Sequence, residues 1–358
     1  MILVTDGEQR SSLAVVRSLG RAGYTVGVCS AHARPLAGAS RHCRVTFRVP
    51  DPAVNAEGFA EAVERLVDLH GVEVLIPMTD VSAPLVLGLR QRVVVPFPEL
   101  KTYERISDKS RLMQVASELD VPVPRQVVVA AQGGASNTTL MDSIRAELTW
   151  PLILKPARSA VLVRGVVQKF GVRSVSGPDE LGRELACYPP EAYPILIQQR
   201  IVGPGLGAFM LGDAQGRVIA SFAHRRIREK PPTGGYRESV PLRDDLRDYS
   251  ERIMSRFAWS GALMLEFKED ASTGTAYLME ANGRFWGSLQ LAIDAGVDFP
   301  RLLVESALGA DVEPIRDYRP GVRSRWLWGD VDHLLWILRA PSGYRSQHPY
   351  LPGRLEAL

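Results

Sequence analysis

The sequence predicts an α/β protein in which a doubly wound parallel sheet comes first and mixed α+β elements follow. Three observations predict this class. Apolar segments alternate with amphipathic ones over about the first 80 residues, as the strands and helices of a parallel sheet do. Two apolar segments within residues 262–282 are joined by a polar, glycine-containing connection typical of a hairpin. The length of 358 residues exceeds what one core usually serves, so we expect two or three domains.

The amino-terminal region is expected to form a Rossmann-like sheet. Its predicted elements are a strand at Ile2–Thr5, a helix from about Gln9 to Ala22, a strand at Tyr24–Cys29, a helix at Ala56–His70 and a strand at Val72–Pro77. The first turn, TDGEQ, lacks the GxGxxG pattern, which argues against a dehydrogenase. Thr79 and Asp80 follow the third strand at the edge where such sheets bind ligands, so both are candidate substrate contacts. A plain helix cap is the alternative.

The middle of the chain places scarce lysines on well-defined elements. A helix is expected to begin at Ser107 or Asp108 and to include Lys109, and polar residues 133–139 are expected to form a loop. The apolar strand PLILK ends in Lys155, a further strand is expected near 165–175, and PILIQQRI at 194–201 forms another. Lys155 suits a phosphate or a nucleobase nitrogen, and a lysine that extends its amine to solvent is the alternative.

A basic strand follows at about residues 218–230. Alternation along it places His224, Arg226 and Arg228 on one face, and Arg225, Ile227 and Glu229 on the other. Concentrated guanidinium groups suit phosphate and carboxylate ligands, and a solvated edge strand is the alternative.

The predicted hairpin, ALMLEFK with AYLMEAN, carries acids inside both strands. With the turn centred near Thr273, Glu266 lies opposite Glu280, with Cβ atoms roughly 4.5–5.5 Å apart. Alternation gives one face to Met264, Glu266 and Lys268 on the first strand and to Leu278, Glu280 and Asn282 on the second, and leaves the core face to Leu263, Leu265, Phe267, Tyr277, Met279 and Ala281.

Two carboxylates this close repel unless a cation lies between them. Glu266, Glu280 and Asn282 together form an all-oxygen half-shell that suits Mg²⁺ completed by water and nucleotide phosphates. Arg284, two residues further on, would then face an anionic reactant. An ordinary solvated hairpin is the alternative.

Helices are predicted before and after this hairpin, at Leu246–Trp259, Gly287–Ala295 and Pro300–Leu308. The last stretch contains Trp326, Trp328 and Trp336 among leucines and isoleucine. We expect it to form a helix that packs on the body of the protein or on a partner subunit, so a homodimer is considered, and a lipid-facing helix is the alternative.

Bulk properties exclude several classes of protein. A hydrophobic content of 46% with 23% charged residues is that of a soluble globular protein, and a net charge of +3 does not indicate nucleic acid or membrane partners. The three cysteines show no disulfide or zinc spacing. The sequence shows no secretory signal pattern and no apolar run of about 20 residues, so we expect a cytoplasmic protein.

The order of these motifs resembles that of the ATP-grasp superfamily, in the form found in carbamoyl-phosphate synthetase, biotin carboxylase and stand-alone ligases of bacterial secondary metabolism. The resemblance covers about residues 105–310 and rests on DK at 108, LKP at 154, QQxIxG at 198, Glu266 and ExNxR at 280. It implies a Rossmann-like domain at 1–100, ATP-grasp subdomains at 101–190 and 191–315, and a tryptophan-rich tail at 316–358.

The resemblance also implies roles for individual residues. ATP would be bound by Lys109, Lys155, Ser159, Gln198, Gln199 and Ile201, and Mg²⁺ or Mn²⁺ by Glu266, Glu280 and Asn282. Arg284 would hold the reacting carboxylate, with Arg226 or Arg228 as the basic catalytic partner. The candidate substrate contacts are Arg225, Ser288, Thr79 and Asp80.

The implied activity is phosphorylation of a small, amino-acid-like carboxylate by ATP, followed by attack of an amine on the acyl phosphate. Because such a transfer brings anions together, a site rich in metal and guanidinium charge suits it. The alternatives are carboxylation through carboxyphosphate and an inactive nucleotide-binding protein. No biotinylation motif or second copy of the domain is found, which argues against carboxylase and carbamoyl-phosphate synthetase activity.

Two positions depart from the family pattern. ARSAV follows Lys155-Pro156 in place of a glycine-rich phosphate lid, so phosphate cover is expected from Arg158, Ser159 and the backbone. Leu206-Gly207 stands where a ribose-binding glutamate is usual.

Overall fold

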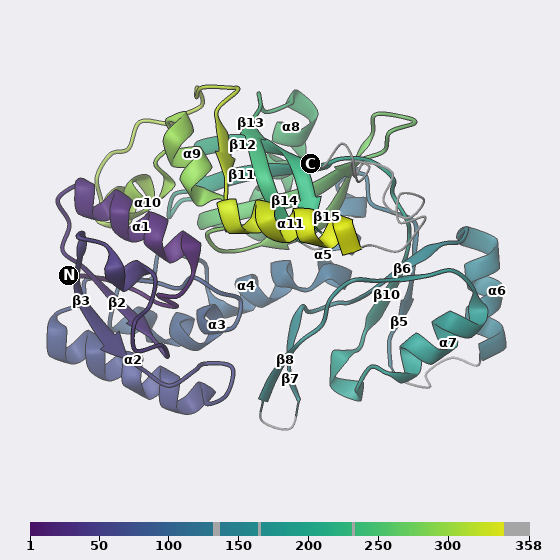
Figure 1. The fold of residues 1–358 in the computed structure, drawn as a ribbon, viewed down its shortest axis with the longest axis horizontal. Coiled ribbons are helices and arrows are strands. Elements are labelled where there is room, and N and C mark those ends of the chain that lie inside the picture. The colour runs from purple at the N-terminus through teal and green to yellow at the C-terminus, as the bar shows by residue number, and fades with distance from the viewer. Residues whose placement is uncertain (132–136, 164–165, 231–232, 340–358) are drawn as a thin grey trace.

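The computed structural model describes residues 1–131, 137–163, 166–230 and 233–339 (Figure 1). The amino-terminal domain contains a parallel sheet in the order β3-β2-β1-β4, with strands β1 (Ile2–Val4), β2 (Val26–Ser30), β3 (Cys43–Arg48) and β4 (Val74–Ile76). Helices α1 (Arg10–Arg21) and α2 (Ala56–His70) lie on either side of it in Figure 1. The expected parallel sheet is therefore confirmed, and β3 is an additional strand whose CRVTFR alternation was the available signal.

Three short helices lead from this domain towards the rest of the chain. They are α3 (Ser82–Leu87), α4 (Leu100–Ser107) and α5 (Lys109–Glu118). The Asp108 carboxylate accepts a hydrogen bond of 3.1 Å from the Arg111 amide, so Asp108 is the N-cap of α5. This cap brings Lys109 to the first turn of the helix.

A second, antiparallel sheet has the order β5-β10-β6-β9 and its own small hydrophobic core. Its elements are β5 (Gln126–Val129), α6 (Asn137–Glu147), β6 (Leu152–Pro156), β9 (Arg173–Val175), α7 (Pro178–Ala186) and β10 (Ile195–Gln199). A separate hairpin of β7 (Ala160–Val163) and β8 (Val166–Lys169) extends from it. The predicted loop at 133–139 lies partly outside the described residues, and its last residues begin α6 instead.

The third sheet is antiparallel, in the order β15-β14-β11-β12-β13-β16. Its elements are β11 (Gly205–Gly212), β12 (Val218–Lys230), β13 (Thr233–Ser239), α8 (Asp244–Phe257), β14 (Gly261–Glu269), β15 (Ala276–Asn282), α9 (Leu289–Ala295), α10 (Phe299–Ala307), β16 (Arg323–Arg325) and α11 (Leu327–Arg339). Helix α11 packs against β12 and β13, so the described part of the tryptophan-rich tail does form a helix on the body of the protein (Figure 1).

The β14–β15 hairpin has the predicted register at its acids but not along its whole length. Glu266 pairs with Glu280, whereas Phe267 pairs with Leu278, so Met279 is an extra residue in β15. This β-bulge turns Leu278 onto the fully buried face and pairs Tyr277 with Lys268. The predicted faces of Leu278 and Tyr277 are therefore wrong, because simple alternation cannot cross a bulge.

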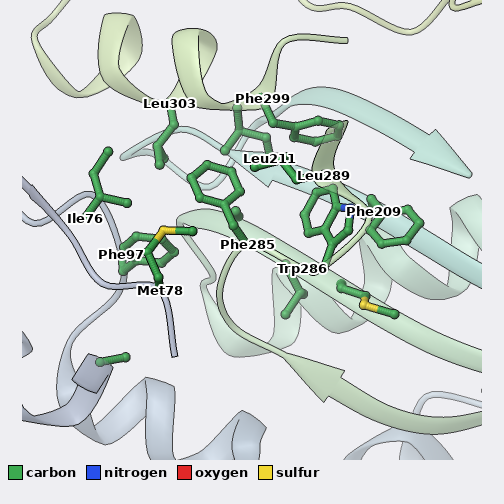
Figure 2. Close-up of a cluster of buried hydrophobic side chains, with 14 of the residues drawn as sticks. Ile76, Met78, Phe97, Phe209, Leu211, Phe285, Trp286, Leu289, Phe299 and Leu303 are labelled. Atoms are coloured by element: carbon green, nitrogen blue, oxygen red, sulfur yellow. The ribbon is translucent and has the colours of Figure 1, made fainter. Parts of the chain in front are cut away.

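A cluster of aromatic residues holds the segment that follows β15 (Figure 2). Phe285 packs edge-on against Phe97 of the amino-terminal domain, and the Trp286 ring lies 4.3 Å from that of Phe209 on β11 and 5.0 Å from that of Phe299 on α10. The amino-terminal domain and the six-stranded sheet share this one continuous core. The two domains therefore pack together at the residues that immediately follow Arg284 in the chain.

Replacing Trp286 by alanine should lower the free energy of unfolding by about 3–5 kcal/mol, because a large buried side chain leaves a cavity where the two domains meet. Urea denaturation of the whole chain measures this. The matched control is Trp328→Ala, since Trp328 is 67% exposed and its loss should change stability by no more than about 0.5 kcal/mol. Equal effects of the two substitutions would contradict the assignment of this core.

Candidate active site

The centre of the candidate site is the pair of acids predicted from the sequence. Glu266 on β14 and Glu280 on β15 are direct cross-strand partners, which confirms the predicted juxtaposition. Arg226 of β12 forms an ion pair with Glu266, and the Lys109 Nζ lies 3.7 Å from a Glu280 carboxylate oxygen. Two cations from distant elements thus offset the repulsion between the two carboxylates.

Hydrogen bonds connect Glu280 to the residues that follow it. The side-chain Nδ2 of Asn282 donates to Glu280 Oε1 at 3.2 Å, and the side-chain Oδ1 of Asn282 accepts from Arg284 Nη2 at 3.3 Å. The same Arg284 nitrogen donates to Asp80 at 2.7 Å, and the Tyr103 hydroxyl donates to the other Asp80 oxygen at 3.2 Å. This series of hydrogen bonds, from Glu280 to Tyr103, therefore connects the six-stranded sheet to the helix that follows the amino-terminal sheet.

The charges of Asp80 and Arg284 stabilise each other. Burial favours the neutral acid, but the Arg284 charge and the hydrogen bonds from Arg284 and Tyr103 outweigh it, so the pKa of Asp80 is lowered. Burial likewise opposes the charge on Arg284, and Asp80 more than compensates, so its pKa is raised. Both groups are ionised at neutral pH. The cap interpretation holds for Thr79, whose hydroxyl accepts from the Ser82 amide at 3.1 Å at the start of α3, and not for Asp80.

The two predicted nucleotide lysines both lie near Glu280. The Lys109 Nζ donates to Ser159 Oγ at 2.7 Å, and the Lys155 Nζ donates to the Met279 carbonyl at 3.4 Å. Both lysines are less than 10% exposed, so Lys155 does not extend to solvent. Burial lowers the pKa of Lys155 to about 8; the Glu280 charge opposes this shift and the Lys109 charge adds to it.

A cavity of about 140 Å³ lies between these groups. Its lining combines residues of the amino-terminal domain, the segment after β6 and strand β15: Asp80, Pro84, Tyr103, Glu104, Ser107, Lys109, Arg158, Ser159, Ala160, Glu280, Ala281 and Asn282. Asp80, Lys109, Ser159, Glu280 and Asn282 were all candidates from the sequence. The fold brings them together around this one cavity.

Other predicted residues are engaged elsewhere. Arg225 lies on the opposite face of β12 from Arg226 and donates to Glu238 at 2.7 Å, so it is not brought to the acid pair.

Gln198 is buried and donates to Gln126 at 2.7 Å, while Gln199 accepts from the Thr149 backbone amide at 2.9 Å.

Ile201 and Arg228 complete the predicted set. The Ile201 carbonyl accepts from the Lys268 Nζ at 3.2 Å, which places this backbone beside the charged face of β14. Arg228, in β12, pairs through its backbone with Tyr236 of β13, and its side chain lies outside the described part of the chain.

The sequence did not predict two residues that contact predicted site residues. Tyr103 could not be found from the sequence, because no local pattern links its helix to Asp80, 23 residues away. His224 was placed on the correct face but given no role, and its Nε2 lies 2.9 Å from Ser288 Oγ, a predicted substrate contact. Burial, together with the charges of Arg237 and Arg226, lowers the pKa of His224 well below its usual range, so its ring is neutral and adds no charge to the site.

The donor set of the acid pair fits magnesium rather than a softer metal. Among the described residues no group of three histidines, cysteines or acids could hold a metal ion by itself. Two carboxylates and one amide oxygen are the incomplete oxygen shell that Mg²⁺ or Mn²⁺ typically completes with water and substrate phosphates. Glu266, Glu280 and Asn282 are therefore chemically suited to such an ion.

Comparison with known proteins identifies the architecture. Residues 193–329 match a protein-family model described as "ATP-grasp in the biosynthetic pathway with Ter operon". This chain has the ATP-grasp fold. The resemblance inferred from the motifs is thus confirmed, although no curated protein matches the sequence.

Solved ATP-grasp structures cover most of the chain. The biotin carboxylase domain of Hydrogenobacter thermophilus 2-oxoglutarate carboxylase, in complex with MgADP, ADP and bicarbonate, has a TM-score of 0.72 at 17% identity, covering 90% of this chain and 73% of that one. The L-amino acid ligase of Bacillus licheniformis gives 0.67 at 17% identity, covering 89% and 77%. N5-carboxyaminoimidazole synthetase of Staphylococcus aureus gives 0.69 at 13% identity, covering 89% and 79%.

The helices in the described ranges are all too short or too polar to cross a membrane.

Binding of ADP should weaken as the pH rises above about 8, by up to about tenfold per pH unit, because Lys155, which we expect to contact the phosphates, loses its proton. Calorimetric titration between pH 7 and 9.5 measures this. Lys155→Arg should remove the dependence, since a guanidinium stays charged, whereas the exposed Lys101→Met control should keep it. The same pH profile in Lys155→Arg would show that another group is responsible.

Proposed function

We propose that this protein is an ATP-dependent ligase that joins a small carboxylate to an amine through an acyl phosphate, releasing ADP and phosphate. The observation that carries the proposal is the continuous arrangement of Glu266, Glu280, Asn282 and Arg284 beside two buried lysines. A centre with two acids and several cations suits the transfer of a phosphoryl group between anions.

The lysines and the acid pair would act on the nucleotide. Lys109 and Lys155 lie near Glu280 and would bind phosphate oxygens, with the Ser159 hydroxyl beside Lys109. Glu266, Glu280 and Asn282 would hold Mg²⁺ or Mn²⁺, which would neutralise charge on the phosphates. The proposed contacts of the nucleobase remain Gln198, Gln199 and the Ile201 backbone. The two glutamine side chains would bind the base while they keep their hydrogen bonds to Gln126 and Thr149.

Arg284 would hold the acid substrate. Its guanidinium is fixed by Asp80 and Asn282, so it can orient a carboxylate with little further loss of side-chain freedom. A carboxylate oxygen would form a bond to the γ-phosphorus as the bond to ADP breaks. The amine nitrogen would then attack the acyl carbon, phosphate would leave, and the nitrogen would lose a proton to give the amide.

Arg226 would offset negative charge on the transferring group, because it already lies against Glu266 in the same site. Arg228 remains a proposed second cation on the same strand. Thr79, Asp80 and Ser288 would border the substrate, with Asp80 acting through Arg284, whereas Arg225 would require a different arrangement to do so.

Carboxylation is the second candidate function. The relative with the TM-score of 0.72 is a biotin carboxylase domain whose structure holds bicarbonate with ADP. In this alternative, bicarbonate would take the place of the carboxylate at Arg284 and carboxyphosphate that of the acyl phosphate. The inactive nucleotide-binding protein has no specific observation in its favour.

Assembly and location are further proposals. The similar Hydrogenobacter domain is described as a dimer, which supports testing for a homodimer here by light scattering. A cytoplasmic location remains a prediction from the sequence.

The first experiment is a screen for ADP and phosphate release with Mg·ATP, in which amino acids are offered singly and in pairs and bicarbonate is offered separately. Release that requires one acid and one amine, with a condensed product detected by mass spectrometry, supports the ligase. Stimulation by bicarbonate supports the carboxylase. Absence of ATP binding would rule out both.

Glu280→Gln should reduce kcat by at least about a hundredfold, because it removes a charge from the proposed metal and phosphate site. ADP release by the active substrate pair measures this. The control is Glu269→Gln on β14, since Glu269 pairs with Arg243 away from the acid pair and its loss should leave kcat within about twofold. Full turnover by Glu280→Gln would show that the hairpin does not hold the reacting nucleotide.

A further inference from the structure

Arg10, the first residue of α1, has an environment that the proposed chemistry does not yet use. The centre of its guanidinium lies 4.4 Å from the centroid of the Trp326 ring, just before α11. Arg10 is only partly buried, and burial lowers the pKa of its guanidinium with no carboxylate of the described residues to oppose the shift. Partial removal of a guanidinium from water without a counter-charge costs free energy, and an anionic ligand would offset that cost.

The Trp326 ring lies close enough to this guanidinium for a cation–π contact, and such a contact uses none of its N–H donors. A Cβ added to Gly287 would lie 3.8 Å from Arg10 Nη2 and within 4 Å of no other atom. The missing side chain of Gly287 therefore leaves space directly beside the donors.

This space lies close to the proposed reaction centre. Gly287 is three residues after Arg284, so their Cα atoms are at most about 11 Å apart. Ser288, bonded to His224, follows immediately. Arg10, Gly287 and Trp326 come from the two ends of the chain and from the segment after β15, and they meet only in the folded protein.

We propose that Arg10 binds the free carboxylate of the amine substrate, so that the acceptor is an amino acid or a peptide rather than a simple amine. The inference rests on the proposed ligase function. When two amino acids are joined, one carboxylate reacts and the other stays free, so two separate cationic groups are needed. Arg284 would hold the first and Arg10 the second, in bidentate geometry against the Trp326 ring.

The main test compares the acceptor found in the substrate screen with its carboxamide. The wild-type protein should prefer the free carboxylate in kcat/KM by about tenfold to a hundredfold, and Arg10→Met should bring this ratio close to one. The KM values for ATP and for the acid should not change. Arg17→Met, an exposed arginine of the same helix, should keep the wild-type ratio. An unchanged ratio in Arg10→Met would overturn the inference.

A second pair of variants tests the site by charge alone. Gly287→Asp would place a carboxylate beside Arg10 and should raise the KM for the acceptor at least about tenfold, whereas Gly287→Asn has the same shape without the charge and should raise it far less. Equal effects of these two substitutions would show that charge at Arg10 plays no part.

Hydroxylamine separates failure of this inference from failure of the ligase function. It is a nucleophile without a carboxylate, and it traps an acyl phosphate as a hydroxamate. Wild type and Arg10→Met should form hydroxamate from the acid and ATP at equal rates if Arg10 binds only the acceptor. A parallel loss in Arg10→Met would overturn the inference alone, and the absence of acid-dependent hydroxamate in the wild type would overturn the ligase function as well.

Discussion

The repulsion between Glu266 and Glu280 is the constraint on which the arrangement of the site depends. The hairpin register places the two carboxylates opposite each other, and the protein balances them with cations from separate elements. Arg226 comes from β12 of the same sheet, whereas Lys109 begins α5, and the buried Lys155 ends the strand β6 of the second sheet. Electrostatic attraction to one acid pair therefore acts between the six-stranded sheet, helix α5 and strand β6.

A tightly packed backbone carries the functional groups of β15 into this site. A Cβ on Gly283 would lie 2.4 Å from the Trp259 ring, so only glycine allows Asn282 and Arg284 to be held on either side of it. Phe285 and Trp286 then enter the shared core, which fixes the direction of the chain just after Arg284 (Figure 2). Polar residues that are proposed to bind metal or substrate thus alternate with buried ones that stabilise the fold.

The departures from the family pattern have structural counterparts. In place of a glycine-rich lid, the chain forms the β7–β8 hairpin, and Ser159 at its base bonds to Lys109. Leu206 pairs with Phe267 and Arg225, so it lies on the face of the sheet opposite Glu266. An acidic side chain at position 206 would therefore point away from the acid pair, and any ribose contact must come from another residue.

The sequence by itself determined the fold class, the pairing of Glu266 with Glu280, the start of α5 and the motif from Glu280 to Arg284, because these follow from local periodicity, capping and short spacings. Its predictions went wrong where one inserted residue, Met279, reversed the alternation of β15. Only the tertiary structure showed that Arg284 donates to Asp80, that His224 bonds to Ser288 and that Arg10 lies against the Trp326 ring. These contacts join residues that are 64 or more positions apart, and they depend on how whole sheets pack, which no local pattern records.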